Sequence, residues 1–265
     1  MIGRSRLKAV GPWIMTLIGA VFFIVPLVGT LELSLRMRRG VYSFDAYAWV
    51  FIDPGFLQSF AYSAVLAVFT IALGTALIVP TAYWVRLRLP HLRPIIEFIT
   101  LMPLVIPAIV IVFGYIRMYN SSSFLPLTNS NLGTDTLLTF AYVTLALPYM
   151  YRAVDTGLGA IDVRTLSEAA ESLGANRLTI IAKVILPNLR TAILSGAFLT
   201  LAIVVGEYIM ASILNRQVLG VYLQNMGANK PYQSWALTVI TFAITWGAMG
   251  LMSWLGRDPR TQTRH

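Results

Sequence analysis

Side chains that could carry out chemistry are scarce in this sequence. It contains no cysteine and only two histidines, His91 and His265, and both histidines lie in basic segments. The lack of cysteine excludes disulfides, thiolate metal sites and cysteine nucleophiles. With so few ligands and bases, we expect no catalytic site, no metal centre and no cofactor. The sequence also contains no Gly-x4-Gly-Lys-Ser/Thr loop, so the chain cannot handle ATP as a P-loop ATPase does.

One acidic residue, Glu207, lies in the middle of a long apolar run. Acidic residues inside membrane spans are costly and are functional candidates by default. Glu207 could therefore face a water-filled translocation pathway and attract a passing cation, with Tyr208 and Asn215 as further pathway candidates. Alternatively, Glu207 pairs with a buried basic or hydroxyl partner and only orders the helix bundle. The sequence leaves both interpretations open.

The elements that would position these residues are membrane spans. Apolar residues make up 57% of the 265-residue chain and charged residues 12%, whereas soluble domains carry about 25% charged residues. Crossing a hydrocarbon core of about 30 Å takes roughly 20 apolar helical residues. Six runs are that long: Pro12–Leu31, Ser59–Val85, Ile95–Ile116, Thr136–Ala153, Thr191–Leu214 and Ser234–Leu255. We therefore predict an all-α, polytopic membrane protein with six transmembrane helices, forming one domain over residues 1–265.

Prolines interrupt several of these predicted spans. Pro80 lies in the second span, Pro103 and Pro107 in the third, and Pro148 in the fourth. Prolines are tolerated in buried spans, where neighbouring groups satisfy the freed carbonyls, and they commonly mark kinks. We therefore expect bent helices.

The distribution of basic residues predicts the orientation of the spans. Both tails are basic, with Arg4, Arg6 and Lys8 at one end and Arg257, Arg260 and Arg264 at the other. The positive-inside rule places both termini in the cytoplasm, which requires an even number of spans. In this orientation 14 of the 20 basic residues lie inside. Three closely spaced outer-side arginines are an exception: Arg36, Arg38 and Arg39.

The net charge of +9 does not indicate nucleic-acid binding. The basic residues cluster at the ends of apolar runs, and no basic stripe with interleaved aromatic residues is present. Basic flanks on membrane spans are the simpler interpretation. The lipid bilayer is therefore an expected partner and nucleic acid is not.

The loop between the fourth and fifth predicted spans is amphipathic. Thr165 and Glu168 have the spacing of a capping box, which predicts a helix that begins there. Gly174 is a natural C′ residue with positive φ for the end of that helix. Asn176 can cap a second helix, and Pro187 suits the first turn of the next one. The sequence therefore predicts a short helix, a tight turn and a second helix that form a rigid protrusion.

This loop resembles a motif of the permease subunits of binding-protein-dependent ABC importers, which have the type I fold. Their pattern is E-A-A-x3-G-x9-I-x-L-P. In this chain Glu168-Ala169-Ala170 precedes Gly174, and Val184-Ile185-Leu186-Pro187 follows after nine residues. Only the isoleucine position departs from the pattern, because it holds Val184.

The resemblance implies that residues 157–190 form a cytoplasmic coupling loop, whose short helix inserts into a cleft on an ATPase subunit. Small side chains in the motif would let the helix seat closely against that partner. The residues implied in coupling are Thr165, Glu168, Ala169, Ala170, Gly174, Leu186 and Pro187.

The resemblance also implies a multi-pass protein of the bacterial inner membrane that works with other chains. The expected partners are two ATP-binding subunits, a second permease subunit that is identical or homologous, and an extracytoplasmic solute-binding protein. The chain is most similar in character to spermidine/putrescine-type permeases, which implies a polyamine cargo. Related permeases for ferric iron, thiamine, phosphonate or oxyanions share much of the pattern.

Two other classes of membrane protein fit the sequence less well. An integral-membrane enzyme would need a polar catalytic cluster, and the two histidines lie outside the predicted spans. A secondary transporter commonly shows duplicated halves or several charges within its spans, and neither feature is present. Transport without chemistry in this chain is therefore the leading hypothesis.

Overall fold

The computed structural model describes residues 3–38 and 40–256. Within these ranges the regular structure is helical and no β-strand is present, which confirms the predicted all-α class. Seven of the basic residues used to predict the orientation are not fully described: Arg39, Arg257, Arg260 and Arg264 lie outside the described ranges, and Arg4, Arg6 and Lys8 are described only as helical backbone.

The helices belong to two compact units. The first unit comprises residues 1–57 and 223–244, and the second comprises residues 58–222 and 245–265. The first contains α1 (Gly3–Ser34), α2 (Asp45–Ile52) and the start of α3 (Pro54–Arg88). It also contains the end of α12 (Leu219–Asn229) and much of α13 (Pro231–Gly256).

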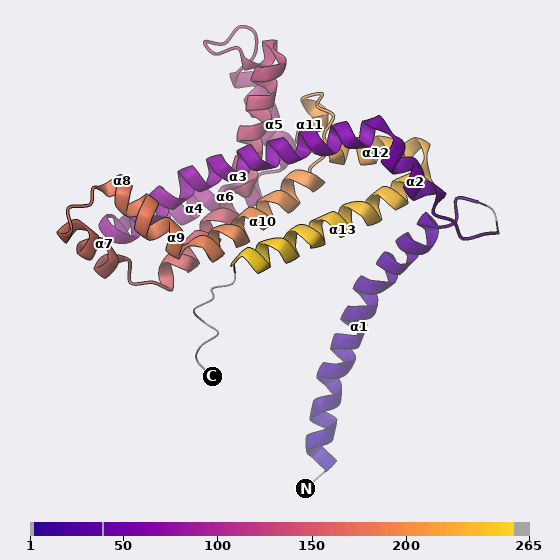
Figure 1. Ribbon diagram of the computed structural model, residues 1–265, viewed down its shortest axis with the longest axis horizontal. Helices are drawn as coiled ribbons and strands as arrows, with labels where there is room; N and C mark the ends of the chain where they lie inside the picture. The colour runs from indigo at the N-terminus through magenta and orange to yellow at the C-terminus, as the bar shows by residue number, and fades with distance from the viewer. Residues whose placement is uncertain (1–2, 39, 257–265) are drawn as a thin grey trace. The chain divides into compact units, whose positions relative to one another are not determined.

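The second unit holds most of α3 and the helices that follow it, which are labelled in Figure 1. These are α4 (Arg93–Val105), α5 (Ala108–Met118), α6 (Asn131–Gly159), α7 (Val163–Ser172), α8 (Arg177–Thr179), α9 (Leu186–Asn188), α10 (Arg190–Gly206) and α11 (Ile209–Ile213). A π-helical segment, Ile180–Ile185, joins α8 to α9, and short 3-10 turns lie at Pro90–Leu92 and Leu127–Asn129.

Four helices are long and apolar enough to cross a membrane without interruption: Gly11–Ser34, Pro54–Arg88, Asn131–Gly159 and Pro231–Trp254. Each contains one of the predicted spans or nearly all of it. Two further candidates are pairs of helices joined at a sharp bend. The described residues therefore provide four continuous spans, or up to six if each bent pair is one span.

The third predicted span, Ile95–Ile116, is not a single helix. It divides into α4 and α5, and the broken segment is bent by 102°. Pro107 explains the break, because a proline disfavours helical backbone in the preceding residue. Ile106 is accordingly extended, with ψ 122°. The predicted distortion is present here, but it is a break between two helices and not a bend within one helix.

The fifth predicted span, Thr191–Leu214, is also interrupted. α10 ends at Gly206, Glu207 has extended backbone with ψ 129°, and α11 begins at Ile209. No proline marks this break. The sequence therefore gave no sign that the acidic residue in this span lies between two helices.

Two buried clusters hold the second unit together. The loop-side core contains residues from α3, α6 and the segment 157–190, including Tyr83, Met150 and Ile185. The break-side core contains residues from α3, α5, α6 and α11, including Tyr142 and Met210.

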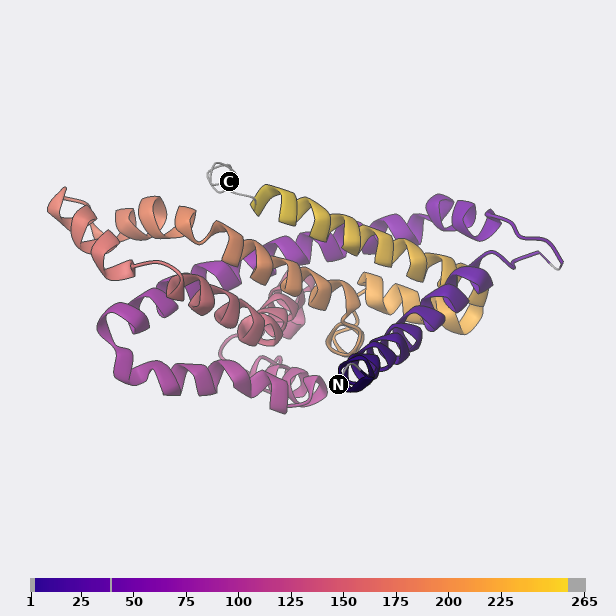
Figure 2. The same cartoon turned by 90° about the horizontal axis from the view of Figure 1, so that it is seen from below.

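Helices α6 and α10 pack side by side (Figures 1 and 2). Small residues permit their close approach, because a Cβ added at Gly157 would lie 2.5 Å from the Cβ of Ala192. The pairing therefore depends on a glycine at this point of α6.

Candidate functional site: the loop of residues 157–190 and the break at Glu207

The first helix of the loop, α7, begins earlier than the sequence predicted. Its N-cap is Asp162, whose carboxylate accepts hydrogen bonds from the Thr165 amide at 3.1 Å and the Thr165 hydroxyl at 2.7 Å. These hydrogen bonds, the hydroxyl first, hold the pKa of Asp162 below its usual value. The predicted capping box is wrong, because the Thr165 hydroxyl acts as a donor. Glu168 instead forms an ion pair with Arg164 at 2.8 Å.

The end of α7 is as predicted. Gly174 has φ 78°, a left-handed conformation that costs a residue with a Cβ about 1–2 kcal/mol. Its amide donates to the Glu171 carbonyl at 2.9 Å, and the next amide, of Ala175, donates to the Ala170 carbonyl at 3.0 Å. This pair of bonds is a Schellman motif, which satisfies carbonyls that the helix end leaves free.

The two motif alanines face opposite ways. Ala170 is buried in the loop-side core, whereas Ala169 is exposed. The small size of Ala170 therefore serves packing within this chain, and only Ala169 presents its methyl group outward.

The second half of the loop follows the predicted order with one local difference. The Asn176 side chain accepts a hydrogen bond from the Thr179 amide at 2.9 Å, which confirms its role as a cap. Pro187 lies in the first turn of α9, next to half-buried Leu186. Upstream, the helix widens into a π-helical turn in which Leu186 donates to Ile181. The wider turn accommodates Pro187, whose ring clashes with a carbonyl in a regular α-helix and which offers no amide donor.

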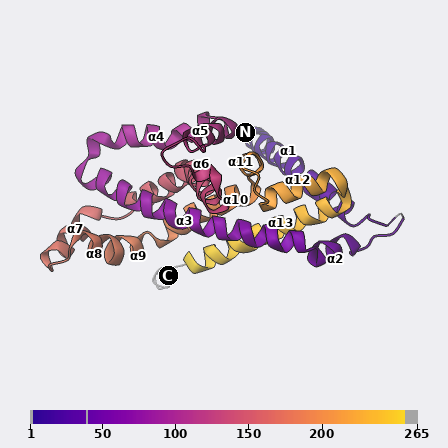
Figure 3. The ribbon, with the colours of Figure 1, turned by 90° about the horizontal axis from the view of Figure 1, so that it is seen from above.

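The sequence analysis did not identify two leucines on the loop as surface residues. Leu173 and Leu178 are 88% and 79% exposed, although both are large and apolar. The exposure of Leu173 could have been predicted, because its position in the helical repeat does not coincide with the buried face formed by Val163, Ser167 and Ala170. Large apolar side chains that gather on one part of a surface can mark a contact site, so these two leucines are candidates for one. Figure 3 shows α7, α8 and α9 together at one end of the second unit.

At the break in the fifth span, the Glu207 carboxylate is engaged by its own backbone. It accepts hydrogen bonds from the Met210 amide at 2.8 Å and the Ala211 amide at 3.2 Å. It also interacts electrostatically with the buried Tyr142 hydroxyl, although that hydroxyl makes no hydrogen bond of standard geometry. The carboxylate thus satisfies two of the first amides after the break, which is a third arrangement beside the two interpretations left open by the sequence.

The other two pathway candidates differ from each other. Tyr208 is 40% exposed, directly at the break. Asn215 is an exposed turn residue with φ 53°, a conformation that asparagine tolerates better than most residues. The turn is held by Arg216, which pairs with Asp135 at 2.8 Å. The structure thus brings Glu207 and Tyr208 together and gives Asn215 a role in the turn.

Comparison with known proteins agrees with this architecture. The family model described as "binding-protein-dependent transport system inner membrane component" matches residues 74–261, well over half of the chain. The matched region includes both the loop and the break.

Two curated relatives carry different names. The chain is 30% identical over 151 residues to a probable molybdenum ABC transporter permease protein of Haloferax volcanii, covering 55% of this chain and 54% of that protein. It is 27% identical over 202 residues to the spermidine/putrescine transport system permease protein PotC of Haemophilus influenzae, covering 73% and 74%. The chain thus spans about half the length of the first relative and about three quarters of the second.

Solved structures share the fold. A chain of a bacterial ABC transporter involved in import of the acidic polysaccharide alginate superposes with a TM-score of 0.70 at 14% identity, covering 97% of this chain and 98% of that chain. A chain of an amino acid ABC transporter superposes with a TM-score of 0.54 at 17% identity, covering 80% and 97%. These likenesses establish the architecture of an importer permease.

Proposed function

Because the chain belongs to the family of binding-protein-dependent transport system inner membrane components, we propose that it forms part of the translocation pathway of an ABC importer for a small solute. The loop of residues 157–190 would couple this chain to a separate ATPase. The observation that carries the proposal is the exposed surface formed by Ala169, Leu173 and Gly174 on a rigid helix end. Within the loop, Thr165, Glu168, Leu186 and Pro187 would hold or flank that surface.

The proposed partners are two ATP-binding subunits, a second permease subunit and an extracytoplasmic solute-binding protein. The transporter for alginate was solved in complex with a pentasaccharide-bound periplasmic protein, which supports the last of these. ATP hydrolysis would then take place on the partner chains, and this chain would act as the transport subunit.

We place both termini in the cytoplasm of a bacterial cell, with α7 on the same side. The outer arginines that weakened this orientation are partly neutralised. Arg36 forms an ion pair with Glu32, and Arg38 forms one with Asp45. The positive-inside rule counts Lys and Arg rather than net charge, so these ion pairs leave the arginines as a local exception to it.

For the cargo, we propose a polyamine such as spermidine or putrescine as the first candidate. The match to the PotC permease covers about three quarters of both chains. The second candidate is an oxyanion, favoured by the relative named for molybdenum. Glu207 favours neither, because its carboxylate is engaged by two backbone amides. Tyr208 is then the pathway candidate with an available side chain.

The proposal is tested by purifying the tagged chain from its native membrane and asking whether an ATP-binding subunit accompanies it. We expect the complex to form with the wild-type chain and to be lost in Leu173→Asp, because a carboxylate would be buried in an apolar contact. Phe124→Asp, at an exposed residue of another loop, is the matched control. If the wild-type chain purifies without any ATPase, the proposed function is wrong. Uptake of spermidine and of molybdate by the reconstituted complex then distinguishes the two cargo candidates.

A further inference from the structure

A buried hydrogen bond joins the last turns of α3 to helix α7 of the loop. The hydroxyls of Tyr83 and Ser167 lie 3.0 Å apart, and both residues are buried. The Ser167 hydroxyl donates to the carbonyl of Val163 at 2.7 Å. A serine hydroxyl has one proton to donate, so Tyr83 must be the donor to Ser167. Ser167 directly precedes the Glu-Ala-Ala motif, so this bond ties the motif helix to α3.

Two exposed contacts also join the end of α3 to both halves of the loop. The Arg177 guanidinium, at the start of α8, lies 5.0 Å from the centre of the Trp84 ring. Arg88 lies 3.7 Å from the carboxylate of Glu171 in α7. Exposed contacts of these kinds are individually weak. Together with the buried Tyr83 bond, however, they fix α7 and α8 to the same end of α3.

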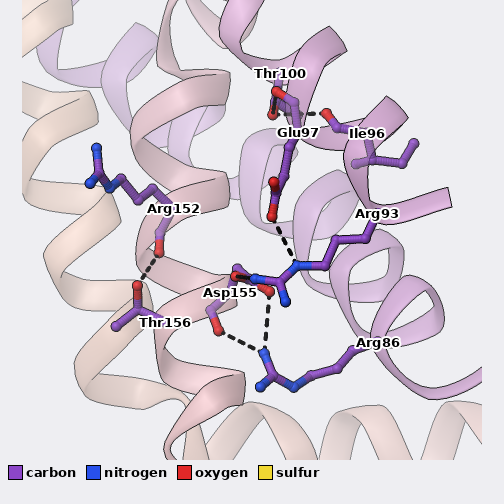
Figure 4. Close-up of polar contacts among 8 residues, drawn as sticks. All are labelled: Arg86, Arg93, Ile96, Glu97, Thr100, Arg152, Asp155 and Thr156. Carbon is purple, nitrogen blue, oxygen red and sulfur yellow. Dashed lines mark hydrogen bonds and ion pairs between the residues drawn. The ribbon is translucent and has the colours of Figure 1, made fainter. Parts of the chain in front are cut away.

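Another residue of the same turns, Arg86, reaches a different partner. Its Nη1 donates to the backbone carbonyl of Asp155 at 3.2 Å and to its Oδ1 at 3.3 Å. Arg93, at the start of α4, donates to the other carboxylate oxygen at 2.8 Å and to Glu97 at 2.8 Å. Figure 4 shows both arginines converging on Asp155, so one carboxylate in α6 joins α3 and α4.

The charges of this cluster balance, since two guanidinium groups face two carboxylates. The Asp155 side chain is only 19% exposed. Charge-assisted hydrogen bonds to a poorly solvated carboxylate are stronger than exposed ion pairs. Removal of that carboxylate would leave two neighbouring arginines without their shared partner, which is costlier than the loss of a surface pair.

We infer that the end of α3 is a transmission hub, in which Tyr83 and Asp155 are positioning residues. Tyr83 holds the loop to α3, and Asp155 holds α3 to the ends of α4 and α6. A displacement imposed on α7 would then move the ends of three spans together rather than only tilting the loop. The inference rests on the proposed function, because it requires that an ATPase displaces α7.

The loop side of the hub is tested with Tyr83→Phe, Ser167→Ala and the double variant, in the full complex with its ATPase. The measured quantity is solute transported per ATP hydrolysed, together with complex assembly by gel filtration. We expect assembly and hydrolysis to persist while transport per ATP falls about threefold to tenfold, within the range found for residues that carry coupling between sites. The double variant should fall no further than the stronger single one, because both changes remove the same bond.

The membrane side is tested with Asp155→Asn, which keeps the shape of the side chain and removes its charge. Arg152→Gln is the control, because Arg152 precedes Asp155 by one turn of α6 and Figure 4 shows its guanidinium directed away from the cluster. We expect Asp155→Asn to lower transport per ATP as the Tyr83 variant does, and Arg152→Gln to leave it within about twofold of the wild type, as for surface changes away from coupled groups.

Three outcomes separate the explanations. Lower transport per ATP in an intact complex supports the hub. Unchanged transport per ATP in Tyr83→Phe and Asp155→Asn overturns it, as does loss of the ATPase from these variants, since the contacts would then only shape the docking surface. If a buried variant fails to fold, Arg88→Gln, at one of the exposed contacts, replaces it, with a smaller decrease expected and an unchanged ratio contradicting the hub. A wild-type chain that binds no ATPase contradicts the proposed function instead.

Discussion

Two helices of the second unit begin at a carboxylate cap, and the surroundings of the two caps differ. Asp162 caps α7 at an exposed position, and the helix presents Leu173 outward at its other end. Glu207, one residue before the N-cap position of α11, caps that helix through the Met210 and Ala211 amides; it is half-buried and close to the buried Tyr142. The loop is thus an outward surface on an internally fixed helix. At the break, the residue that attracts attention in the sequence is engaged within the chain.

The comparison teaches that a charge inside a span is not necessarily available to a substrate. A carboxylate can be retained because a broken helix needs its first amides satisfied. With this capping role, which is part of the proposal, Glu207 would be compatible with a cargo of either charge. It also moves the question of cargo from Glu207 to the exposed side chain next to it, Tyr208.

The largest effect is expected at Gly220, which packs against the backbone of Glu207. A Cβ at Gly220 would collide with the Glu207 carbonyl group, and backbone atoms cannot move aside as a flexible side chain can. We expect Gly220→Ala to destabilise the protein by about 1–3 kcal/mol, as overpacking does. The measurement is thermal unfolding of the detergent-purified chain.

Gly114→Ala is the control for this substitution, since a Cβ at Gly114 meets no atom within 4 Å. Equal melting temperatures for the two variants would show that the break is not tightly packed. The contrast with the exposed loop would then lose its basis.

The next effect is expected at Gly174, on the loop side of the comparison. A Cβ there meets no neighbouring atom, so the cost is the left-handed backbone, about 1–2 kcal/mol. We expect Gly174→Val to reduce ATP-driven uptake strongly, by deforming the end of α7, and Gly174→Asn to retain most of it, because asparagine tolerates positive φ. Full activity of Gly174→Val would mean that the Schellman turn is not needed for coupling.

Glu207 offers the sharpest test of the capping role. Glu207→Gln keeps a side-chain oxygen that can accept from the Met210 amide, whereas Glu207→Ala removes both bonds. We expect the alanine variant to lose about 1–2 kcal/mol of stability and the glutamine variant to lose less and to keep transporting. If Glu207→Gln folds normally but abolishes uptake of a cationic cargo, the carboxylate acts on the substrate and the capping explanation is incomplete.

The smallest effect is expected at Asp162. Asp162→Ala should leave transport nearly unchanged and speed hydrogen exchange at the Thr165 amide, which loses its acceptor. The lowered pKa sets the sign of the pH dependence. The cap is fully present above the ordinary aspartate pKa of about 3.9, and its stabilisation is lost as the pH falls through the lower folded-state pKa. If lowering the pH of the wild type to about 5 already reduced the protection of the Thr165 amide against exchange, this expectation would be wrong.

The fold could largely be predicted from the sequence because long apolar runs have few alternatives to membrane helices. The end of α7 was equally predictable, since few residue types other than glycine suit the left-handed turn at position 174. The start of α7 was not, because Asp162 and Thr165 are both good N-caps three residues apart. Only the packing of Val163, which is buried in the loop-side core, places the earlier residue at the helix start.

The candidate site was harder to predict for a related reason. The break at Glu207 has no proline, unlike the one at Pro107, and its backbone packs against Gly220. These residues are close in space because of tertiary packing, which leaves no periodic signal in the sequence. The Tyr83–Ser167 bond, which joins residues 84 positions apart, was beyond reach for the same reason.

The account depends most on the loop as the docking surface for a separate ATPase, and a single engineered cysteine tests this directly. The chain contains no cysteine, so Leu173→Cys provides one unique thiol at the tip of α7. We predict that a short thiol-directed cross-linker joins this residue to the ATP-binding subunit in the assembled complex, and that Phe124→Cys on the loop between α5 and α6 gives no such product. Cross-linking from Phe124→Cys but not from Leu173→Cys would contradict the account.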